Sequence, residues 1–101
     1  MGKKEQFFRL ISSNTQRLKS LGVKELGLFG SVQKGNDTLG SDIDLLVEFE
    51  EGEKNFDHLF SLKEFLENNL NCSVDLMTKK SLSAVIGPKI LKEIDYVQIT
   101  N

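Results

Sequence analysis

Two aspartates and an upstream glycine–serine pair are the residues of this sequence whose types and spacing could support phosphate chemistry. Asp42 and Asp44 are separated by one residue, and ten residues lie between Ser31 and Asp42. Alternate side chains of a strand share one face, so a strand here would hold both carboxylates side by side. Paired carboxylates repel each other unless a cation lies between them. Hard oxygen ligands of this kind suit Mg²⁺ that carries substrate phosphates.

The residues around these aspartates predict a strand with one packed face and one chelating face. A calcium loop of the EF-hand type is excluded, because Leu46 stands where an oxygen ligand is needed and no glycine and distal glutamate follow at the required spacing. Apolar side chains occupy the alternate positions, namely Ile43, Leu45, Val47 and Phe49.

The glycine–serine pair follows a short apolar segment and offers groups that bind anions. Gly30 at a strand end would let the backbone approach a phosphate without a Cβ in between, and the amides that follow can form an anion-binding nest. The hydroxyl of Ser31 adds a donor. The sequence has neither the Gly-x-x-x-x-Gly-Lys-Ser/Thr signature of a Walker loop nor a dinucleotide-binding fingerprint, so those folds are excluded.

The elements that must position these residues follow from hydrophobic periodicity and turn residues. Strands that alternate with helices predict an α/β fold, more closely α+β, with a small mixed sheet flanked by helices. The order of the strands cannot be read from the pattern. The first part of the chain is expected to form a helix over 4–21 stopped by Gly22, and then a strand over 23–29 that runs into a tight turn at Gly30 and Ser31. A loop over 34–41, a strand over 42–49 and an acidic loop follow, and then a helix through 59–70 that Asn55 or Asp57 caps. The last part is expected to form a strand over 73–77, a helix that Thr78 caps and that leads to a break at Gly87 and Pro88, and a final helical turn or two over 89–95.

Length and composition limit the class of protein. A chain of 101 residues with 39% hydrophobic residues can bury one modest core, which predicts a single domain over 1–101. The 13 basic and 15 acidic residues nearly cancel, so general binding to nucleic acid or to an anionic membrane is disfavoured. The single cysteine, Cys72, and the lack of a leading apolar run favour a cytoplasmic protein. No stretch approaches the roughly 20 apolar residues that span a bilayer.

These motifs together resemble the signature of the DNA polymerase β nucleotidyltransferase superfamily, and specifically of its minimal bacterial members. The core of the likeness is the glycine–serine pair, ten residues, and then Asp42-x-Asp44. Asp75, after the second main helix, matches the third acidic residue that the family carries on a later strand. Residues 88–97 are similar to the family's ending, and the likeness covers the chain from about Gly22 onward.

The resemblance implies a magnesium-dependent transfer of a nucleoside monophosphate from a nucleoside triphosphate, here ATP, to a hydroxyl. Asp42 and Asp44 would hold two Mg²⁺ ions, and Asp75 would complete the second metal site and help to generate the nucleophile. Gly30 and Ser31 would hold the pyrophosphate end of the nucleotide.

Lys34 departs from the family's pattern. Minimal members often carry an arginine in a Gly-Ser-x-Ala-Arg-Gly segment, whereas residues 30–35 of this chain read Gly-Ser-Val-Gln-Lys-Gly. A lysine keeps a positive charge for a phosphate but lacks the planar fork that binds a phosphate through two parallel hydrogen bonds. We expect Lys34 to bind the nucleotide more weakly than an arginine would, or to hold it in a different orientation.

The resemblance also implies a protein partner. Minimal members are often paired with a small helical HEPN ribonuclease toxin, so this chain would be the antitoxin that adenylylates a tyrosine of that toxin. Two alternatives stay open. One is adenylylation of a small molecule such as an aminoglycoside, in a pocket formed by dimerisation or by another subunit. The other is neutralisation of the toxin by contact alone, against which the intact aspartates argue.

Overall fold

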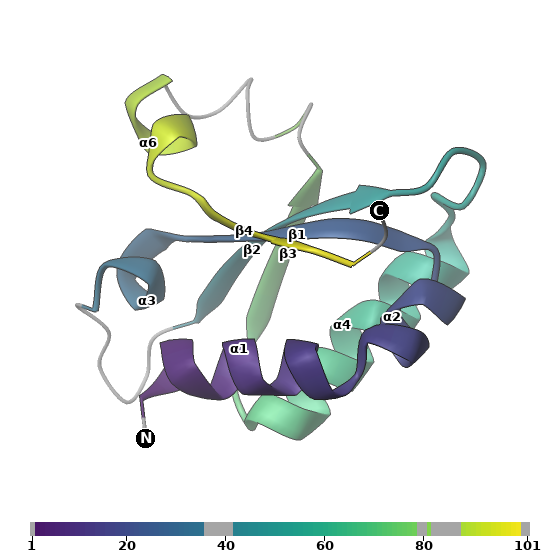
Figure 1. Cartoon of the computed structure of the whole chain (residues 1–101), viewed down its shortest axis with the longest axis horizontal. Helices are drawn as coiled ribbons and strands as arrows, with labels where there is room; N and C mark the ends of the chain where they lie inside the picture. Colours follow the sequence, from purple (N-terminus) through teal and green to yellow (C-terminus); the bar gives the residue numbers. More distant parts are fainter. Residues whose placement is uncertain (1, 36–41, 79–80, 82–87, 100–101) are drawn as a thin grey trace.

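The computed structural model describes residues 2–35, 42–78, 81 and 88–99. It contains a four-stranded sheet with helices packed on it (Figure 1). The described elements are α1 (Lys3–Ser13), α2 (Thr15–Ser20), β1 (Val23–Phe29), α3 (Gly30–Lys34), β2 (Ile43–Phe49), α4 (Phe56–Leu70), β3 (Val74–Thr78), α6 (Pro88–Lys92) and β4 (Asp95–Gln98).

The sheet is mixed and has the strand order β3-β2-β1-β4. β1 pairs antiparallel with β2 on one side and with β4 on the other, whereas β2 and β3 run parallel. A parallel pair needs a long crossover connection, and α4 supplies it. The predicted small mixed sheet with flanking helices is therefore confirmed. The observed order places β2, which begins directly after Asp42, between β1 and β3.

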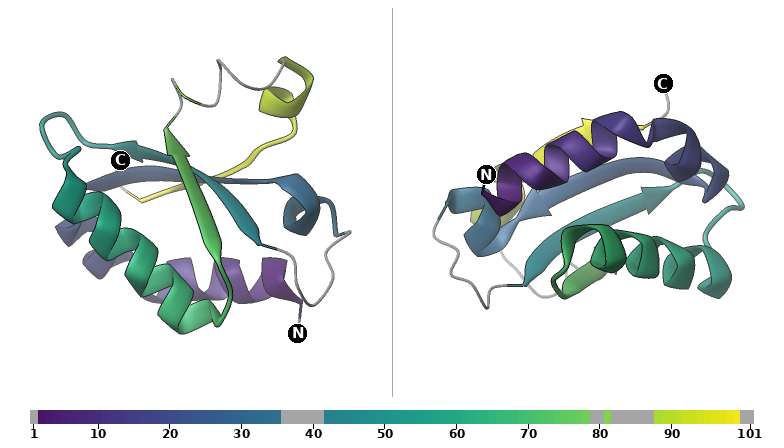
Figure 2. Two further views of the ribbon diagram at one scale, coloured as in Figure 1. Left: turned by 180° about the vertical axis from the view of Figure 1, so that it is seen from behind. Right: turned by 90° about the horizontal axis from the view of Figure 1, so that it is seen from below.

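One face of the sheet is covered by α1, α2 and α4, as Figure 2 shows. The side chains that meet there form the main core, in which Ile43, Leu45 and Val47 of β2 are at most 2% exposed. Phe49 packs against the same cluster. The predicted apolar face of this strand is confirmed. The buried members of this core are Phe7, Ile11, Leu18, Val23, Leu26, Leu28, Val32, Ile43, Leu45, Val47, Leu62, Leu66, Leu70, Val74 and Ile99.

The opposite face of the sheet carries a smaller apolar cluster. Phe29, Leu46 and Ile94 are at most 9% exposed there, and Met77 and Leu91 pack against them. α6 lies on this side of the sheet, away from α1, α2 and α4 (Figures 1 and 2). Because alternate residues of β2 share a face, this is also the face to which its acidic residues belong.

The single helix predicted over 4–21 is two helices. Asn14 interrupts it with φ −131° and ψ 29°, and its side-chain amide donates to the carbonyl of Leu10 at 2.8 Å. A side chain that occupies a backbone acceptor competes with the helical hydrogen bonds, so a new helix starts at Thr15. Gly22 follows the second helix with φ 78°, in agreement with its predicted role as the stop.

Two predictions about the polar segments are wrong. Gly30 and Ser31 open the short helix α3 where a tight turn was predicted. The helical turns predicted over 89–95 end at Lys92, and Asp95 begins a strand. That strand is fixed by its pairing with β1, a long-range interaction that local periodicity does not report.

The ends of α4 and β3 agree with the predicted capping residues. Asn55 caps α4, because its Oδ1 accepts a hydrogen bond from the amide of His58 at 2.8 Å. Thr78 Oγ1 accepts a hydrogen bond from the amide of Ser81 at 3.2 Å, as a helix cap would. The rest of the helix predicted after Thr78 lies outside the described residues. Residues 36–41 of the predicted loop also lie outside them. Among the described helices, none has the length and apolar character required to cross a membrane.

We predict that Phe7→Ala lowers the free energy of unfolding by about 3–5 kcal/mol, because the ring is fully buried and its removal leaves a cavity. Phe60→Ala is the matched control, since that ring is 55% exposed on α4, and we expect it to cost less than about 1 kcal/mol. Urea unfolding followed by circular dichroism measures both. Equal losses in the two variants would contradict the assignment of Phe7 to the core.

Candidate functional site

The parallel pairing of β2 and β3 places three acidic residues at one end of two neighbouring strands. Asp44 and Asp75 are Cα partners in this pairing. Asp42 directly precedes β2, and the amide of Ile43 donates to the carbonyl of Ser73 at 3.0 Å, which fixes where the pairing starts. The three aspartates singled out in the sequence therefore lie at the same end of two neighbouring strands.

Negative charge is crowded around Asp44. Its carboxyl is partly buried, and this burial raises its pKa above the ordinary value, while the charges of Asp75 and Asp42 raise it further. Asp42 and Asp75 are exposed. Within the described ranges, no three acidic, histidine or cysteine side chains are close enough to form a metal cage by themselves. A cation bound here would need further oxygen ligands, and phosphates are ligands of that kind.

Gly30 lies against the carboxylate of Asp44. Phe29 is the Cα partner of Asp44 in the pairing of β1 with β2, so the next residue of the chain passes beside this carboxylate. A Cβ at position 30 would collide with Asp44 Oδ2, and the φ of 79° also disfavours any residue other than glycine. Ser31 follows as the second residue of α3 and is partly buried. The structure thus brings Gly30 of the glycine–serine pair to Asp44.

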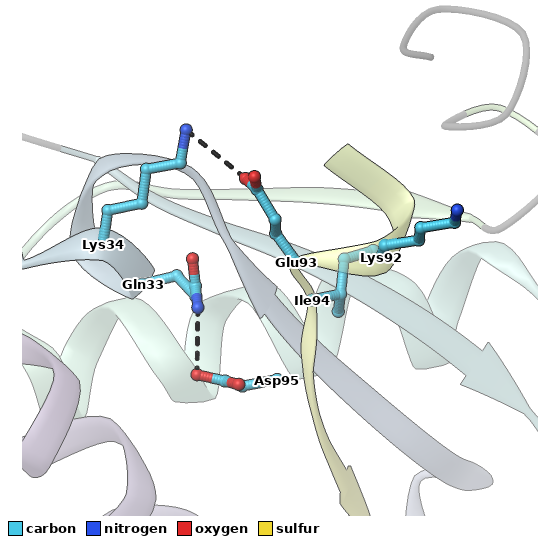
Figure 3. A pocket seen from close by; sticks show the side chains of 6 residues that line it. All are labelled: Gln33, Lys34, Lys92, Glu93, Ile94 and Asp95. Atoms are coloured by element: carbon cyan, nitrogen blue, oxygen red, sulfur yellow. Dashed lines mark hydrogen bonds and ion pairs between the residues drawn. The ribbon is translucent and has the colours of Figure 1, made fainter. Parts of the chain in front are cut away.

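Lys34, at the far end of α3, forms an ion pair of its own. Its Nζ lies 3.5 Å from Glu93 Oε2, so in this structure its partner is a glutamate of the C-terminal segment and not one of the three aspartates (Figure 3). Val32 anchors the same helix in the core, and Gly35 ends the helix with φ 76°. The predicted nucleotide-binding lysine is therefore near the site but engaged elsewhere.

A hollow of about 510 Å³ opens beside α3. Gln33 and Lys34 line it from α3, and residues 92–95 line it from the segment that joins α6 to β4 (Figure 3). None of the three aspartates lines this hollow. It is a neighbour of the acidic cluster and not the cluster itself.

Sequence reasoning missed the polar contacts that tie α3 to other elements. Gln33 Nε2 donates to Asp95 Oδ2 at 3.2 Å, and Lys4 Nζ lies 3.2 Å from the same oxygen. Gln33 and Asp95 are 62 residues apart, and no local pattern links them. The pairing of β4 with β1 places Asp95 beside α3, so this contact could be found only after that strand had been recognised.

Residues 10–97 match the family model described as a nucleotidyltransferase domain. The chain belongs to this nucleotidyltransferase family. The matched region includes Gly30, Ser31 and all three aspartates. The recognition of a minimal nucleotidyltransferase from the glycine–serine pair and the spaced aspartates is thereby confirmed.

Two relatives of this nucleotidyltransferase domain are named as protein adenylyltransferases. MntA of Thermococcus cleftensis is 36% identical over 94 residues, which is 92% of this chain and 94% of that protein. A Methanocaldococcus jannaschii protein, provisionally named a protein adenylyltransferase, is 43% identical over 74 residues, which is 72% of this chain and 71% of that one. The similarity to each thus extends over most of both chains.

Solved structures share the fold of this nucleotidyltransferase domain. A provisionally assigned minimal nucleotidyltransferase is 27% identical, has a TM-score of 0.65, and overlaps 94% of this chain and 95% of its own. A toxin–antitoxin complex determined with AMP-PNP contains a chain that is 23% identical, with a TM-score of 0.61, over 95% of this chain and 71% of that one. At 23% identity, the similarity to the chain of the toxin–antitoxin complex establishes a shared fold and nothing further.

Gly30→Ala should destabilise the protein more than Gly35→Ala does. Both glycines have positive φ, so each alanine carries strain of about 1–2 kcal/mol. A Cβ at position 35 meets open space, whereas one at position 30 must displace Asp44, which adds about 1–3 kcal/mol. The difference between the two variants in chemical unfolding isolates the contact with Asp44. If both lose the same free energy, Gly30 is not packed against this carboxylate.

Asp44→Asn is expected to raise the melting temperature at neutral pH in metal-free buffer. The folded-state pKa of Asp44 is raised above its ordinary value of 3.8, so between these two pKa values the native state binds more protons than the unfolded state. The free energy of unfolding therefore falls as the pH rises from 3.8 through the folded-state pKa. The asparagine removes this loss. Below 3.8 both side chains are neutral and the advantage should disappear. A variant that is less stable than the wild type at neutral pH would contradict this electrostatic description.

Proposed function

We propose that this chain, acting as a single domain over 1–101, transfers AMP from ATP to a hydroxyl group of a protein, in a reaction that requires Mg²⁺. The observation that carries the proposal is the alignment of Asp44 with Asp75 on parallel strands, with Gly30 packed against Asp44. A triphosphate needs both a cation and a backbone that can approach it closely, and these residues offer the two side by side.

The three aspartates suit Mg²⁺ by their chemistry. They supply hard carboxylate oxygens, and the pKa of Asp44 is raised by burial first and by the charges of Asp75 and Asp42 second, so that a cation at this position would stabilise the ionised carboxylate. We assign Asp42 and Asp44 to hold two Mg²⁺ ions, with Asp75 completing the second metal position. When bound, Mg²⁺ neutralises the charge that develops on the phosphates during transfer.

The transfer forms one bond and breaks another. The acceptor oxygen bonds to the α-phosphorus of ATP, the bond from that phosphorus to the bridging oxygen of pyrophosphate breaks, and pyrophosphate leaves with the electron pair. Asp75, exposed beside Asp44, takes the proton of the acceptor hydroxyl in this proposal. Gly30 and Ser31 hold the pyrophosphate end, through backbone amides and the serine hydroxyl.

Lys34 contributes a positive charge to the nucleotide in this proposal. Its amine already has an acidic partner in Glu93, at 3.5 Å. Both side chains of the pair are partly exposed, but the paired oxygen of Glu93 is itself buried and accepts no hydrogen bond from the described part of the chain, so the attraction of the lysine to a phosphate must offset the loss of this contact. The lysine would therefore move toward the nucleotide when the nucleotide binds.

The acceptor we propose is a tyrosine of a small helical HEPN ribonuclease toxin, with this chain as its cytoplasmic antitoxin. The relatives named as protein adenylyltransferases support a protein acceptor. The shared fold with chains from toxin–antitoxin complexes is an analogy at the level of the fold, and it makes such a toxin the first candidate to test.

Incubation of the purified protein with Mg²⁺, ATP labelled on the α-phosphate and a candidate helical toxin should label the toxin. Asp44→Asn and Asp75→Asn should each lower the transfer rate at least about 100-fold, since each removes a ligand worth several kcal/mol. Asp57→Asn is the matched control, because that exposed aspartate lies in the first turn of α4, and it should keep wild-type activity.

The same assay separates the alternatives. Label on an aminoglycoside and none on the toxin would replace the protein acceptor by a small molecule. A stable complex with the toxin, without transfer of label, would mean that the chain neutralises the toxin by contact.

A further inference from the structure

The short helix α3 carries the glycine–serine pair at its first two positions, so its orientation decides where that pair lies. α3 has five residues, Gly30–Lys34, and Gly35 ends it in a left-handed conformation. Val32 fixes one side of the helix in the core. One buried side chain in a helix of little more than one turn leaves rotation about that anchor to be restrained by other contacts.

A closed set of polar contacts supplies that restraint. Gln33 Nε2 donates to Asp95 Oδ2 at 3.2 Å, Lys4 Nζ lies 3.2 Å from the same oxygen, and Lys4 Nζ donates to the backbone carbonyl of Gln33 at 3.1 Å. Each of the three residues contacts the other two. The triad Lys4–Gln33–Asp95 thus joins α1, α3 and β4, and Figure 3 shows the contact of Gln33 with Asp95.

The charge state and exposure of the triad bear on what it can do. The hydrogen bond from Gln33 and the contacts with Lys4 hold the pKa of Asp95 below its ordinary value, so the carboxylate is ionised at neutral pH. Lys4 and Asp95 are both close to half exposed. Exposed ion pairs contribute little to global stability, so the triad matters less for folding than for the local orientation of α3.

We propose that Asp95 is a positioning residue, which acts through Gln33 and Lys4 to hold α3 in the orientation that presents Gly30 and Ser31 to the triphosphate. The proposal rests on the proposed function for the identity of the ligand. Displacements of about 1 Å at groups that position a substrate can lower rates by as much as 100-fold, and the backbone at Gly30 lies in contact with Asp44. A small rotation of α3 therefore changes the distance between the phosphate-binding pair and the proposed metal ligands.

The test uses Asp95→Ala and Asp95→Asn in the full chain, with two measurements of the site and a melting temperature that checks the stability of each variant. Titration with a fluorescent ATP analogue in Mg²⁺ should show about tenfold weaker binding for Asp95→Ala, a loss in the range that misplacement produces, and a smaller loss for Asp95→Asn, whose side-chain oxygen still accepts from Gln33. Hydrogen–deuterium exchange without nucleotide should be faster over residues 30–34 in Asp95→Ala and closer to wild type in Asp95→Asn. The melting temperatures of all variants should stay near that of the wild type.

Two further variants make the result specific. Gln98 lies on the same strand as Asp95, and its side chain contacts Glu25 on β1 and not α3. Gln98→Ala should therefore change neither nucleotide binding nor exchange over residues 30–34. Gln33→Ala removes only the direct hydrogen bond to Asp95, because Lys4 still contacts the backbone carbonyl at position 33 and Asp95. It should give part of the Asp95→Ala loss, and the double variant should lose no more than Asp95→Ala alone.

Two outcomes would overturn the proposal. One is wild-type exchange over residues 30–34 in Asp95→Ala, and the other is faster exchange spread evenly over the whole chain, which would mean general destabilisation. A wild-type protein that binds no nucleotide would refute the proposed function separately, and the exchange measurement would still decide whether Asp95 restrains α3.

Discussion

The site depends on one constraint, which is that two negative side chains, Asp44 and Asp75, are kept as neighbours by the pairing of β2 with β3. Their repulsion and the partial burial of Asp44 oppose folding. The same two strands bury Ile43 and Val74 in the main core on their other face, at no more than 1% exposure. Apolar burial on one side of the sheet therefore offsets the electrostatic cost on the other.

The position of α3 follows from the same constraint. The glycine at position 30 lets the backbone turn out of β1 while touching the carboxylate of Asp44, which no larger residue could do. Two different kinds of contact then hold the helix. Val32 is fixed by apolar packing, and Gln33 by polar contacts with Asp95 and Lys4. The glycine–serine segment, the acidic cluster and the last described strand are in this way parts of one arrangement.

Much of the acidic site could be predicted from the sequence, because its signals are local. The alternation around Asp42 and Asp44 fixed the strand and its faces, and the buried alternate residues agree with it. Asp75 was placed by family resemblance, since nothing within the strand itself indicates its partner. The tight turn at Gly30 was a wrong prediction, because glycine and serine are as compatible with a short helix that long-range packing stabilises. β4 was missed for a related reason: a strand of four residues is defined by its pairing with β1, not by its own pattern.

The place of β4 in the sheet bears on how the protein is made. β4 is the last described strand along the chain, yet it pairs with β1, the first. While the ribosome is still adding residues 95–98, β1 keeps an unpaired edge that another extended chain can occupy, and such edges favour association between unfinished molecules. The outer margin of this sheet is therefore closed only after the other described strands have been made.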